Sequence, residues 1–263
     1  MSLPLTSRRA LVGGSTQGIG RAVAQLLAEQ GCAVTLLARN EERLREVAAA
    51  LPTPAEARHN YLVADFDDPS HLETVVQGYL AQHPEGFHIL INNTGGPAGG
   101  PLLDASVDDL RIAFNQHVVC NHLLAQAVVP GMRAAGFGRI INIISTSVKI
   151  PLAGLGVSNT IRGAVASWAK TLANELGPAG ITVNNVLPGA TLTQRHTSLI
   201  EKKVTQTGQS AEAIEADMLK TIPARRFGHA EEVAAAVVFL ASPAAGYING
   251  TSVPVDGGRT GAL

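Results

Sequence analysis

A glycine-rich segment near the beginning of the chain has the composition of a phosphate-binding turn. After a short apolar run the sequence reads Gly13-Gly14-Ser15-Thr16-Gln17-Gly18-Ile19-Gly20, and a helical pattern follows at once. In such a turn one glycine permits the sharp bend, another lets backbone N–H groups approach a diphosphate, and a third lets the helix pack closely on the strand. An ordinary glycine-rich turn is the alternative, but the position between a strand and a helix favours a dinucleotide site.

The end of the second predicted strand indicates which dinucleotide would bind. An acid there, about 20 residues beyond the glycines, would accept a hydrogen bond from the ribose 2′-hydroxyl of NAD. The sequence has Ala38-Arg39-Asn40 instead, and the guanidinium fork of Arg39 suits the 2′-phosphate of NADP. The alternative is that Arg39 is a solvated charge at the head of the next helix. We therefore expect NADP, with NAD as the second choice.

Later segments add a set of short motifs in a fixed order. They are Ala64-Asp65-Phe66-Asp67-Asp68, Asn92-Asn93-Thr94-Gly95, Ile181-Thr182-Val183-Asn184 through Pro188-Gly189, Ile222-Pro223 through Phe227-Gly228, Phe239-Leu240-Ala241-Ser242 and Val255-Asp256-Gly257-Gly258. With the glycine turn, they resemble the classical short-chain dehydrogenase/reductase family over nearly the whole chain. Gly13 stands where that family usually has a threonine, and Thr94 replaces an alanine. The resemblance implies a Rossmann-type fold, binding of NAD or NADP, and a homotetramer.

The same resemblance implies which residues contact the cofactor. The glycine turn would hold the diphosphate, the segment around Asp65 the adenine ring, and the turn at Pro188 the nicotinamide. The expected cofactor-binding residues are Gly14, Ser15, Thr16, Gln17, Gly18, Ile19, Gly20, Arg39, Asp65, Phe66, Asn93, Gly95, Arg162, Pro188, Gly189 and Thr191.

Family members generally reduce a carbonyl or oxidise an alcohol with an Asn–Ser–Tyr–Lys set, and three of the four positions differ here. The serine corresponds to Ser145, at the end of an apolar run, and would orient the substrate oxygen. The tyrosine position, thirteen residues further on, is Ser158, and the lysine position four beyond that is Arg162. Counting back from Ser145, the asparagine position is His117.

Each replacement changes the chemistry that the site can perform. An aliphatic hydroxyl is a much weaker acid than a phenol of pKa ~10, so Ser158 cannot replace the tyrosine directly. Arg162 keeps a positive charge and can bind ribose hydroxyls, but it stays protonated. His117 is expected to titrate near neutral pH and to pass a proton through an ordered water. Lys149, four residues after Ser145, is another cation near the expected pocket.

Each candidate except Ser145 also has a purely structural interpretation. Ser158 could cap the helix that begins near it, and Arg162 could lie on the surface of that helix. His117 could be a satisfied core histidine, and Lys149 an exposed loop charge. Ser145 has the strongest catalytic case, because its position follows directly from the strand before it.

Other chemistries find no support in the sequence. The segment Gly156-Val157-Ser158-Asn159-Thr160 begins like the nucleophile elbow of a hydrolase but lacks the closing glycine. The eight histidines show no spacing that would gather a metal ion, so no metal site is expected.

Alternating strand and helix patterns must position these residues. Strands are predicted at 9–12, 33–37, 61–64, 88–92, 139–145, 181–187 and 252–255, and helices at 19–30, 41–51, 70–83, 107–135, 158–176 and 231–241. Most of the strands are continuous Val/Ile/Leu runs, which is typical of strands buried on both faces. We expect an α/β, doubly wound, mainly seven-stranded parallel sheet with helices on both faces, forming one dinucleotide-binding domain over residues 1–263. Residues 190–223 show no clear core pattern and are expected to form a substrate lid.

Composition limits the remaining classes of function. Hydrophobic residues make up 46% and charged residues 16% of the 263 residues, and the net charge is −1. This balance excludes a disordered chain and provides no basic surface for nucleic acid or an anionic membrane. The longest apolar stretch, 233–241, is far shorter than the ~20 residues of a membrane span, and the first residues show no signal-peptide pattern. Cys32 and Cys120 are isolated thiols, as in a reducing compartment, so we expect a cytoplasmic protein.

Three functions stay open at this stage. The first is an NADP(H)-dependent, 3-oxoacyl-reductase-like oxidoreductase acting on a small carbonyl compound or alcohol. In it, Ser145 orients the substrate oxygen, Arg162 holds the ribose, and a water or His117 supplies the proton. The second is an NADP(H)-binding sensor or scaffold with little redox turnover. The third is a non-redox lyase that uses the same pocket.

Overall fold

Seven parallel strands form the central sheet of the computed structural model, which describes residues 5–54 and 57–262. Their order is β3-β2-β1-β4-β5-β6-β9, and every neighbouring pair is parallel. Their bounds are β1 (Arg9–Gly13), β2 (Ala33–Ala38), β3 (Asn60–Val63), β4 (Ile89–Asn92), β5 (Gly138–Ile143), β6 (Ile181–Pro188) and β9 (Ser252–Val255). The predicted doubly wound α/β fold is confirmed, and the strand order reverses between β1 and β4, where such sheets bind ligands.

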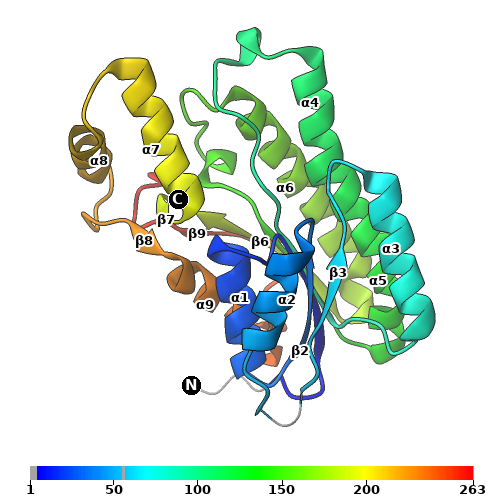
Figure 1. The fold of residues 1–263 in the computed structure, drawn as a ribbon. Helices are drawn as coiled ribbons and strands as arrows, with labels where there is room; N and C mark the ends of the chain where they lie inside the picture. Colours follow the sequence, from blue (N-terminus) through cyan, green and yellow to red (C-terminus); the bar gives the residue numbers. More distant parts are fainter. Residues whose placement is uncertain (1–4, 55–56, 263) are drawn as a thin grey trace.

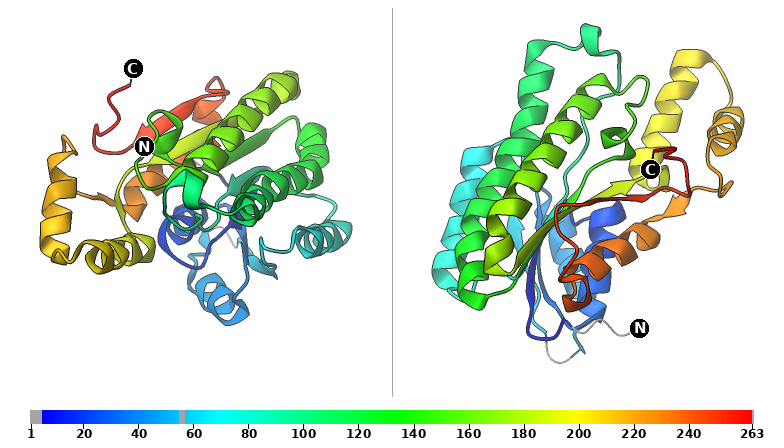
Figure 2. Two further views of the ribbon diagram at one scale, coloured as in Figure 1. Left: turned by 90° about the horizontal axis from the view of Figure 1, so that it is seen from above. Right: turned by 180° about the vertical axis from the view of Figure 1, so that it is seen from behind.

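Helices cover both faces of this sheet (Figure 1). One face carries α1 (Gly18–Glu29), α2 (Glu41–Ala50) and α9 (Ala230–Ala241). The other carries α3 (Pro69–Gln82), α5 (Cys120–Ala135) and α6 (Gly156–Leu176), and α4 (Val107–Phe114) stands beside α6. Figure 2 shows the sheet between these two layers. Short 3₁₀ turns join the elements at η2 (Leu102–Asp104), η4 (Thr146–Val148), η5 (Gly177–Ala179) and η6 (Pro243–Ala245).

The continuous apolar runs of the strands fill two cores, one on each side of the sheet. In β2, Leu36 belongs to the cluster under α1 and α9, whereas Leu37 belongs to the cluster under α3 and α5. Both are fully buried, because successive side chains of a strand point to opposite faces. Burial of each leucine stabilises the fold by about 1.5–3 kcal/mol, so a polar residue at either position would be costly.

The helix predicted at 107–135 is interrupted, so that part of the prediction was wrong. A π-helical turn, η3 (Asn115–Val119), separates α4 from α5. At its end the N–H of Cys120 donates to the carbonyl oxygen of Asn115, five residues earlier. A single widened turn leaves the apolar periodicity on either side intact, which is why the sequence pattern does not reveal it.

The segment without a clear core pattern contains two helices. It begins with β7 (Thr191–Leu192), continues into α7 (Gln194–Thr207) and α8 (Ala211–Lys220), and its first strand pairs with β8 (Gly228–His229). Figure 1 shows α7 and α8 beside the carboxyl ends of the sheet strands. Nowhere in the described chain is there a helix with the length and apolar character needed to cross a lipid bilayer.

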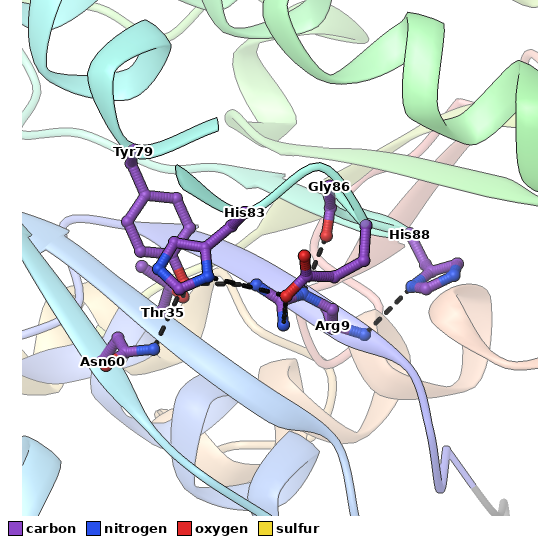
Figure 3. Close-up of polar contacts among 8 residues, drawn as sticks. Arg9, Thr35, Asn60, Tyr79, His83, Gly86 and His88 are labelled. Atoms are coloured by element: carbon purple, nitrogen blue, oxygen red, sulfur yellow. Dashed lines mark hydrogen bonds and ion pairs between the residues drawn. The ribbon is translucent and has the colours of Figure 1, made fainter. Parts of the chain in front are cut away.

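A polar network ties β1 to its neighbours at the opposite, amino-terminal edge of the sheet (Figure 3). Nε of Arg9 donates to the carbonyl oxygen of Gly86 at 2.8 Å, and its Nη1 pairs with Glu85 at 2.5 Å. The backbone N–H of Arg9 donates to Nδ1 of His88, and its Nη2 donates to the hydroxyl of Tyr79. Because these groups satisfy one another, the network stabilises this edge and leaves the opposite edge for ligands.

Candidate active site

The glycine turn after β1 has the geometry of a phosphate cradle. Gly14 and Gly18 adopt φ angles of 55° and 53°, which side chains disfavour. A Cβ on Gly20 would lie 2.2 Å from the carbonyl oxygen of Gly14, far inside any real contact. Glycine is therefore required at all three positions, as the sequence spacing predicts.

The first turn of α1 leaves backbone N–H groups free to meet an anion. The N–H of Arg21 donates to the carbonyl oxygen of Gln17 at 3.2 Å, so the amides of Gly18, Ile19 and Gly20 precede the intrahelical bonds. No acidic side chain lies in this first turn. A diphosphate would meet free amides and the positive end of the helix dipole, so the residues present fit a dinucleotide.

Two of the expected cofactor residues hold this turn in shape with their side chains. Nδ2 of Asn93, just after β4, lies 3.1 Å from the carbonyl oxygen of Gly13 and 3.2 Å from that of Gly14, and donates to both. The hydroxyl of Ser15 is fully buried and accepts a hydrogen bond from the N–H of Leu37 at 3.1 Å. Their side chains therefore position the backbone that a diphosphate would contact.

The end of β2 presents Arg39 at the surface. Its Nη1 lies 3.6 Å from Oδ2 of Asp65, and both side chains are exposed. Phe66, predicted to lie against the adenine ring, is buried in the core cluster under α3 and α5. Its ring lies 3.2 Å from the Cβ position of Gly13, so the side chain of Phe66 supports the glycine turn from within the core.

The start of α7 lies against the glycine turn, and the turn after β6 lies against Asp256. A Cβ on Gly189 would lie 2.7 Å from Cα of Asp256, so Pro188 can be followed only by glycine without a shift of backbone. The hydroxyl of Thr191 donates to the carbonyl oxygen of Gly189 at 3.2 Å. The methyl group of Thr193, which caps α7, lies 3.4 Å from the Cβ position of Gly18.

Ser145 follows β5 and is half-buried at the carboxyl edge of the sheet. Its Oγ accepts a hydrogen bond from the N–H of Ser147 at 3.1 Å, which fixes the direction of the hydroxyl group. Among the described residues, no acceptor is recorded for the hydroxyl hydrogen of Ser145, so this hydrogen is available to a ligand oxygen. That Ser145 orients a substrate oxygen stays a prediction.

Arg162 lies on α6 and is buried, so the interpretation of this residue as a helix-surface side chain was wrong. It is 8% exposed, and its Nη1 donates to the carbonyl oxygen of Ile143 at 2.9 Å. Its Nε is buried without a hydrogen-bond partner in the described chain. Burial, with a smaller contribution from the positive charge of Arg195, lowers the pKa of Arg162 to about 10. Arg162 is therefore a protonated donor near neutral pH.

His117 lies on the π-helical turn η3 and is only 2% exposed. Burial lowers the pKa of His117 to about 2, the charge of Arg162 acts in the same direction, and a hydrogen bond with the backbone of Gly95 acts against both. The expectation that His117 titrates near neutral pH was therefore wrong. Its Nε2 has no partner among the described residues, and a neutral imidazole can still donate from one nitrogen and accept at the other.

Ser158 is half-buried in the first turn of α6, four residues before Arg162 and hence on the same face. The residue that caps this helix is Leu155, so the interpretation of Ser158 as the cap was wrong. Lys149 is exposed at the end of η4, in agreement with its interpretation as a loop charge.

One residue of this region was missed by the sequence analysis. Arg195, in the first turn of α7, donates from Nη2 to the carbonyl oxygen of Pro97 at 2.8 Å. Partial burial lowers the pKa of Arg195. Its only sequence signal was an arginine at the start of a helix inside the predicted lid, and no spacing connects it with Arg162.

The described residues contain no group of three or more His, Cys, Asp or Glu side chains that would hold a metal ion. The described groups at this edge of the sheet include the hydroxyl of Ser145, the guanidinium of Arg162 and the imidazole of His117.

Known proteins match nearly the whole chain. The family pattern described as Enoyl-(Acyl carrier protein) reductase matches residues 14–260. The NADPH-dependent reductase BacG of Bacillus subtilis is 31% identical over 255 residues, which cover 97% of this chain and 98% of BacG. The 3-oxoacyl-[acyl-carrier-protein] reductase FabG of Haemophilus influenzae is 32% identical over 249 residues, which cover 95% and 96% of the two chains.

A solved structure agrees with the fold over its full length. The structure of L-sorbose reductase from Gluconobacter frateurii, complexed with NADPH and L-sorbose, is 30% identical and has a TM-score of 0.92. The match covers 100% of each chain, so the strands, the glycine turn and the segment from 190 to 223 all have counterparts in that protein.

Proposed function

The chain belongs to the short-chain dehydrogenase/reductase family, and from this premise we propose that it is an NADPH-dependent reductase of a small carbonyl compound with a non-standard catalytic site. The observation that carries the proposal is the arrangement at one edge of the sheet. There the glycine turn with its free amides follows β1, and Ser145, whose hydroxyl is aimed by Ser147, follows β5, two strands away in the sheet. Relatives named for reduction with NADPH support the same direction of reaction.

The chain's own residues would hold the cofactor at two points. The amides at the start of α1 bind the diphosphate, and Arg39 binds the 2′-phosphate that distinguishes NADP from NAD. The ion pair of Arg39 with Asp65 is exposed and contributes about 0–1 kcal/mol, so it gives way easily to a phosphate. When bound, NADPH supplies a hydride to the carbonyl carbon of the substrate.

Ser145 and Arg162 act on the carbonyl oxygen. The hydroxyl of Ser145 donates a hydrogen bond to this oxygen, since its lone pair is already engaged by the N–H of Ser147. Arg162 keeps its charge at neutral pH and lies against the end of β5, where a positive charge stabilises the negative charge that develops on the oxygen. Neither group needs to change its protonation state for this role.

The proton for the new hydroxyl group comes from water, either directly or through His117. Ser158 is too weak an acid and too short, and Arg162 stays protonated. A neutral His117 gives one ring proton to the alkoxide oxygen while its other nitrogen takes a proton from water, so the imidazole stays uncharged and the hydroxide ion passes to solvent. This replaces the phenol that the family usually employs.

Residues 190–223 form the proposed lid over the substrate. The cap of α7, Thr193, lies against Gly18 itself, so movement of α7 would open or close the cofactor site. We also propose a homo-oligomer, with a tetramer as the family resemblance suggests. The exposed apolar side chains of Val107, Ile112 and Phe114 on α4 support an interface there.

The alternative is an NADPH-binding sensor or scaffold with little redox turnover, and the absence of a phenol at Ser158 favours it. Calorimetry with NADPH and NADH, followed by NADPH oxidation across a panel of aldehydes and ketones, decides between the two. The reductase requires both binding and oxidation, and binding without any oxidation supports the alternative. No binding of either nucleotide at millimolar concentration overturns both.

The Ser145→Ala variant tests the assigned catalytic role. Loss of one donor to a developing oxyanion lowers kcat by about 10²–10³-fold, while the dissociation constant of NADPH stays unchanged. Thr171→Ala is a matched control, because Thr171 is an exposed hydroxyl on α6 that bonds only along its own helix, to the carbonyl oxygen of Ser167. Equal activity of Ser145→Ala and the wild type would contradict the assignment.

A further inference from the structure

We propose that Arg162 and Arg195 together bind an anionic group of the substrate, so that the protein acts on carbonyl compounds that carry a carboxylate. This inference rests on the proposed reductase function and adds the class of substrate. It concerns a pair of guanidinium groups that the sequence analysis did not bring together.

The two guanidinium groups converge on one point from two separate elements. A Cβ on Gly96 would lie 3.4 Å from Nη2 of Arg195 and 3.6 Å from Nη2 of Arg162. Arg162 comes from α6 and is buried, whereas Arg195 comes from α7 and is exposed. The lack of a side chain at Gly96 leaves space between the two nitrogens, within reach of the two oxygens of a single carboxylate.

Neither arginine has a carboxylate partner in the described chain. Six other arginines pair with acids there: Arg9 with Glu85, Arg39 with Asp65, Arg43 with Glu46, Arg45 with Glu41, Arg111 with Asp108 and Arg226 with Glu232. The charged group that affects the pKa of Arg162 is instead Arg195, which is also positive. Two neighbouring positive charges, one of them buried, cost free energy unless an anion lies between them. Arg162 and Arg195 would therefore be stabilised by an anionic ligand.

A second buried arginine shows what a structural guanidinium looks like in this fold. Arg139 is 4% exposed, and its Nε and Nη1 donate to the carbonyl oxygens of Ser242, Gly138 and Gly180. Arg162 has one such bond, to Ile143, and its buried Nε has no partner among the described residues. The guanidinium N–H groups of Arg139 therefore donate to backbone oxygens, whereas Arg162 has N–H donors left for a ligand.

The charge, the donors and the location favour a carboxylate of the substrate. Arginine forks bind carboxylates through two parallel hydrogen bonds, and a lysine or serine at these positions would not. Arg162 is bonded to the carbonyl oxygen of Ile143, which precedes Ser145 by two residues. An anion bound by the two arginines would therefore place the rest of the substrate beside the hydroxyl of Ser145. A phosphate of the cofactor is the other possible oxyanion, because α7 also touches the glycine turn.

Calorimetry on the NADPH-saturated protein tests the proposal with 2-, 3- and 4-oxo acids, each paired with its methyl ester. We expect the acids to bind and the esters to bind at least ~10-fold more weakly, since charged hydrogen bonds are lost. Arg195→Gln, an exposed position that should fold normally, lowers acid affinity by ~10–100-fold and leaves ester affinity unchanged. Arg133→Gln is the matched control, because Arg133 is exposed at the end of α5, at the opposite edge of the sheet.

The remaining outcomes separate this proposal from the reductase function. Esters that bind as well as acids, or a panel in which no acid binds, overturn the anion site. Arg195→Gln could instead bind NADPH more weakly in the absence of substrate and bind the acids as well as the wild type does. That result assigns Arg162 and Arg195 to a cofactor phosphate and also overturns the anion site. Acids that bind in an Arg195-dependent manner without NADPH oxidation leave the anion site standing and overturn the reductase. NADPH oxidation with neutral carbonyl compounds alone leaves the reductase standing and overturns the anion site.

Discussion

Nη1 of Arg162 donates a 2.9 Å hydrogen bond to the carbonyl oxygen of Ile143, the last residue of β5. This bond places a charge that stays positive across the neutral pH range two residues before Ser145, at the position where the family usually has a lysine. A lysine ammonium is a flexible point charge, whereas the guanidinium has a fixed fork that remains tied to the strand. At neutral pH the candidate site therefore has a charge of the usual sign with a different geometry and no proton to exchange.

Restoring the family's usual pair should restore its usual chemistry. The double variant Ser158→Tyr with Arg162→Lys supplies a phenol of tunable pKa and a neighbouring ammonium on the same face of α6. We expect carbonyl reductase activity to rise by about 10²–10⁴-fold, the range that a positioned acid contributes. Steady-state NADPH oxidation with neutral ketones measures it. No gain at unchanged NADPH affinity would show that the pocket serves a different reaction.

The preference for NADP is expected to depend on Arg39. In Arg39→Ala the 2′-phosphate loses a charged hydrogen-bond partner, so the dissociation constant of NADPH rises by ~10–100-fold, whereas that of NADH changes little. Fluorescence titration with the two nucleotides measures both constants. An equal loss for both nucleotides would place Arg39 outside the 2′-phosphate site, and Arg133→Ala controls for the removal of one surface charge.

The pH dependence of the reaction should be flat across the neutral range. The pKa of His117 is lowered to about 2 and that of Arg162 to about 10, so neither group changes charge between about pH 4 and pH 9. Above this window Arg162 begins to lose its proton, and kcat/KM should fall as the pH rises through about 10. A pH profile of kcat/KM with a break between pH 6 and 7 would show that an imidazole titrates in the reaction, contrary to the neutral His117.

The fold was predictable because the burial pattern of the strands is local. Continuous apolar runs such as the one through Leu36 and Leu37 identify strands covered on both faces, and the glycines at 14, 18 and 20 mark a turn that tolerates no side chain. The helix from 107 to 135 was predicted without its π-helical turn, since one extra residue in a turn leaves the flanking periodicity unchanged. Local sequence patterns were therefore enough to predict the strands and helices, but not the irregular turn within a helix.

Residues of the candidate site were predictable only where a sequence motif or a fixed spacing from it identifies them. Ser145 follows from its strand, and Arg162 and His117 follow from spacing, but their charge states depend on burial and on each other across α6 and η3. The expectation for His117 failed for that reason. Arg195 was missed because its approach to Arg162 is made by the tertiary fold, between residues 33 positions apart in the sequence.

Burial of a neutral His117 links the stability of the fold to pH. The unfolded imidazole has a pKa of about 6.5, and the folded one of about 2, so the unfolded state binds one more proton between these values. Stability therefore rises with pH inside this window, is fully present above about pH 6.5, and is lost as the pH falls below it. The loss attributable to one such group approaches ~1.4 kcal/mol per pH unit.

The His117→Gln variant should remove this contribution. Glutamine keeps a polar group near the backbone of Gly95 but has no titratable proton, so its free energy of unfolding falls less steeply between pH 6 and pH 4.5. Urea denaturation at several pH values measures the slopes, and the other histidines contribute equally to both proteins. His71→Gln, which removes an imidazole at the surface of α3, is the control and should keep the wild-type slope. Identical slopes for His117→Gln and the wild type would mean that His117 is not held neutral by the fold, and the uncharged proton relay proposed for it would fail with that result.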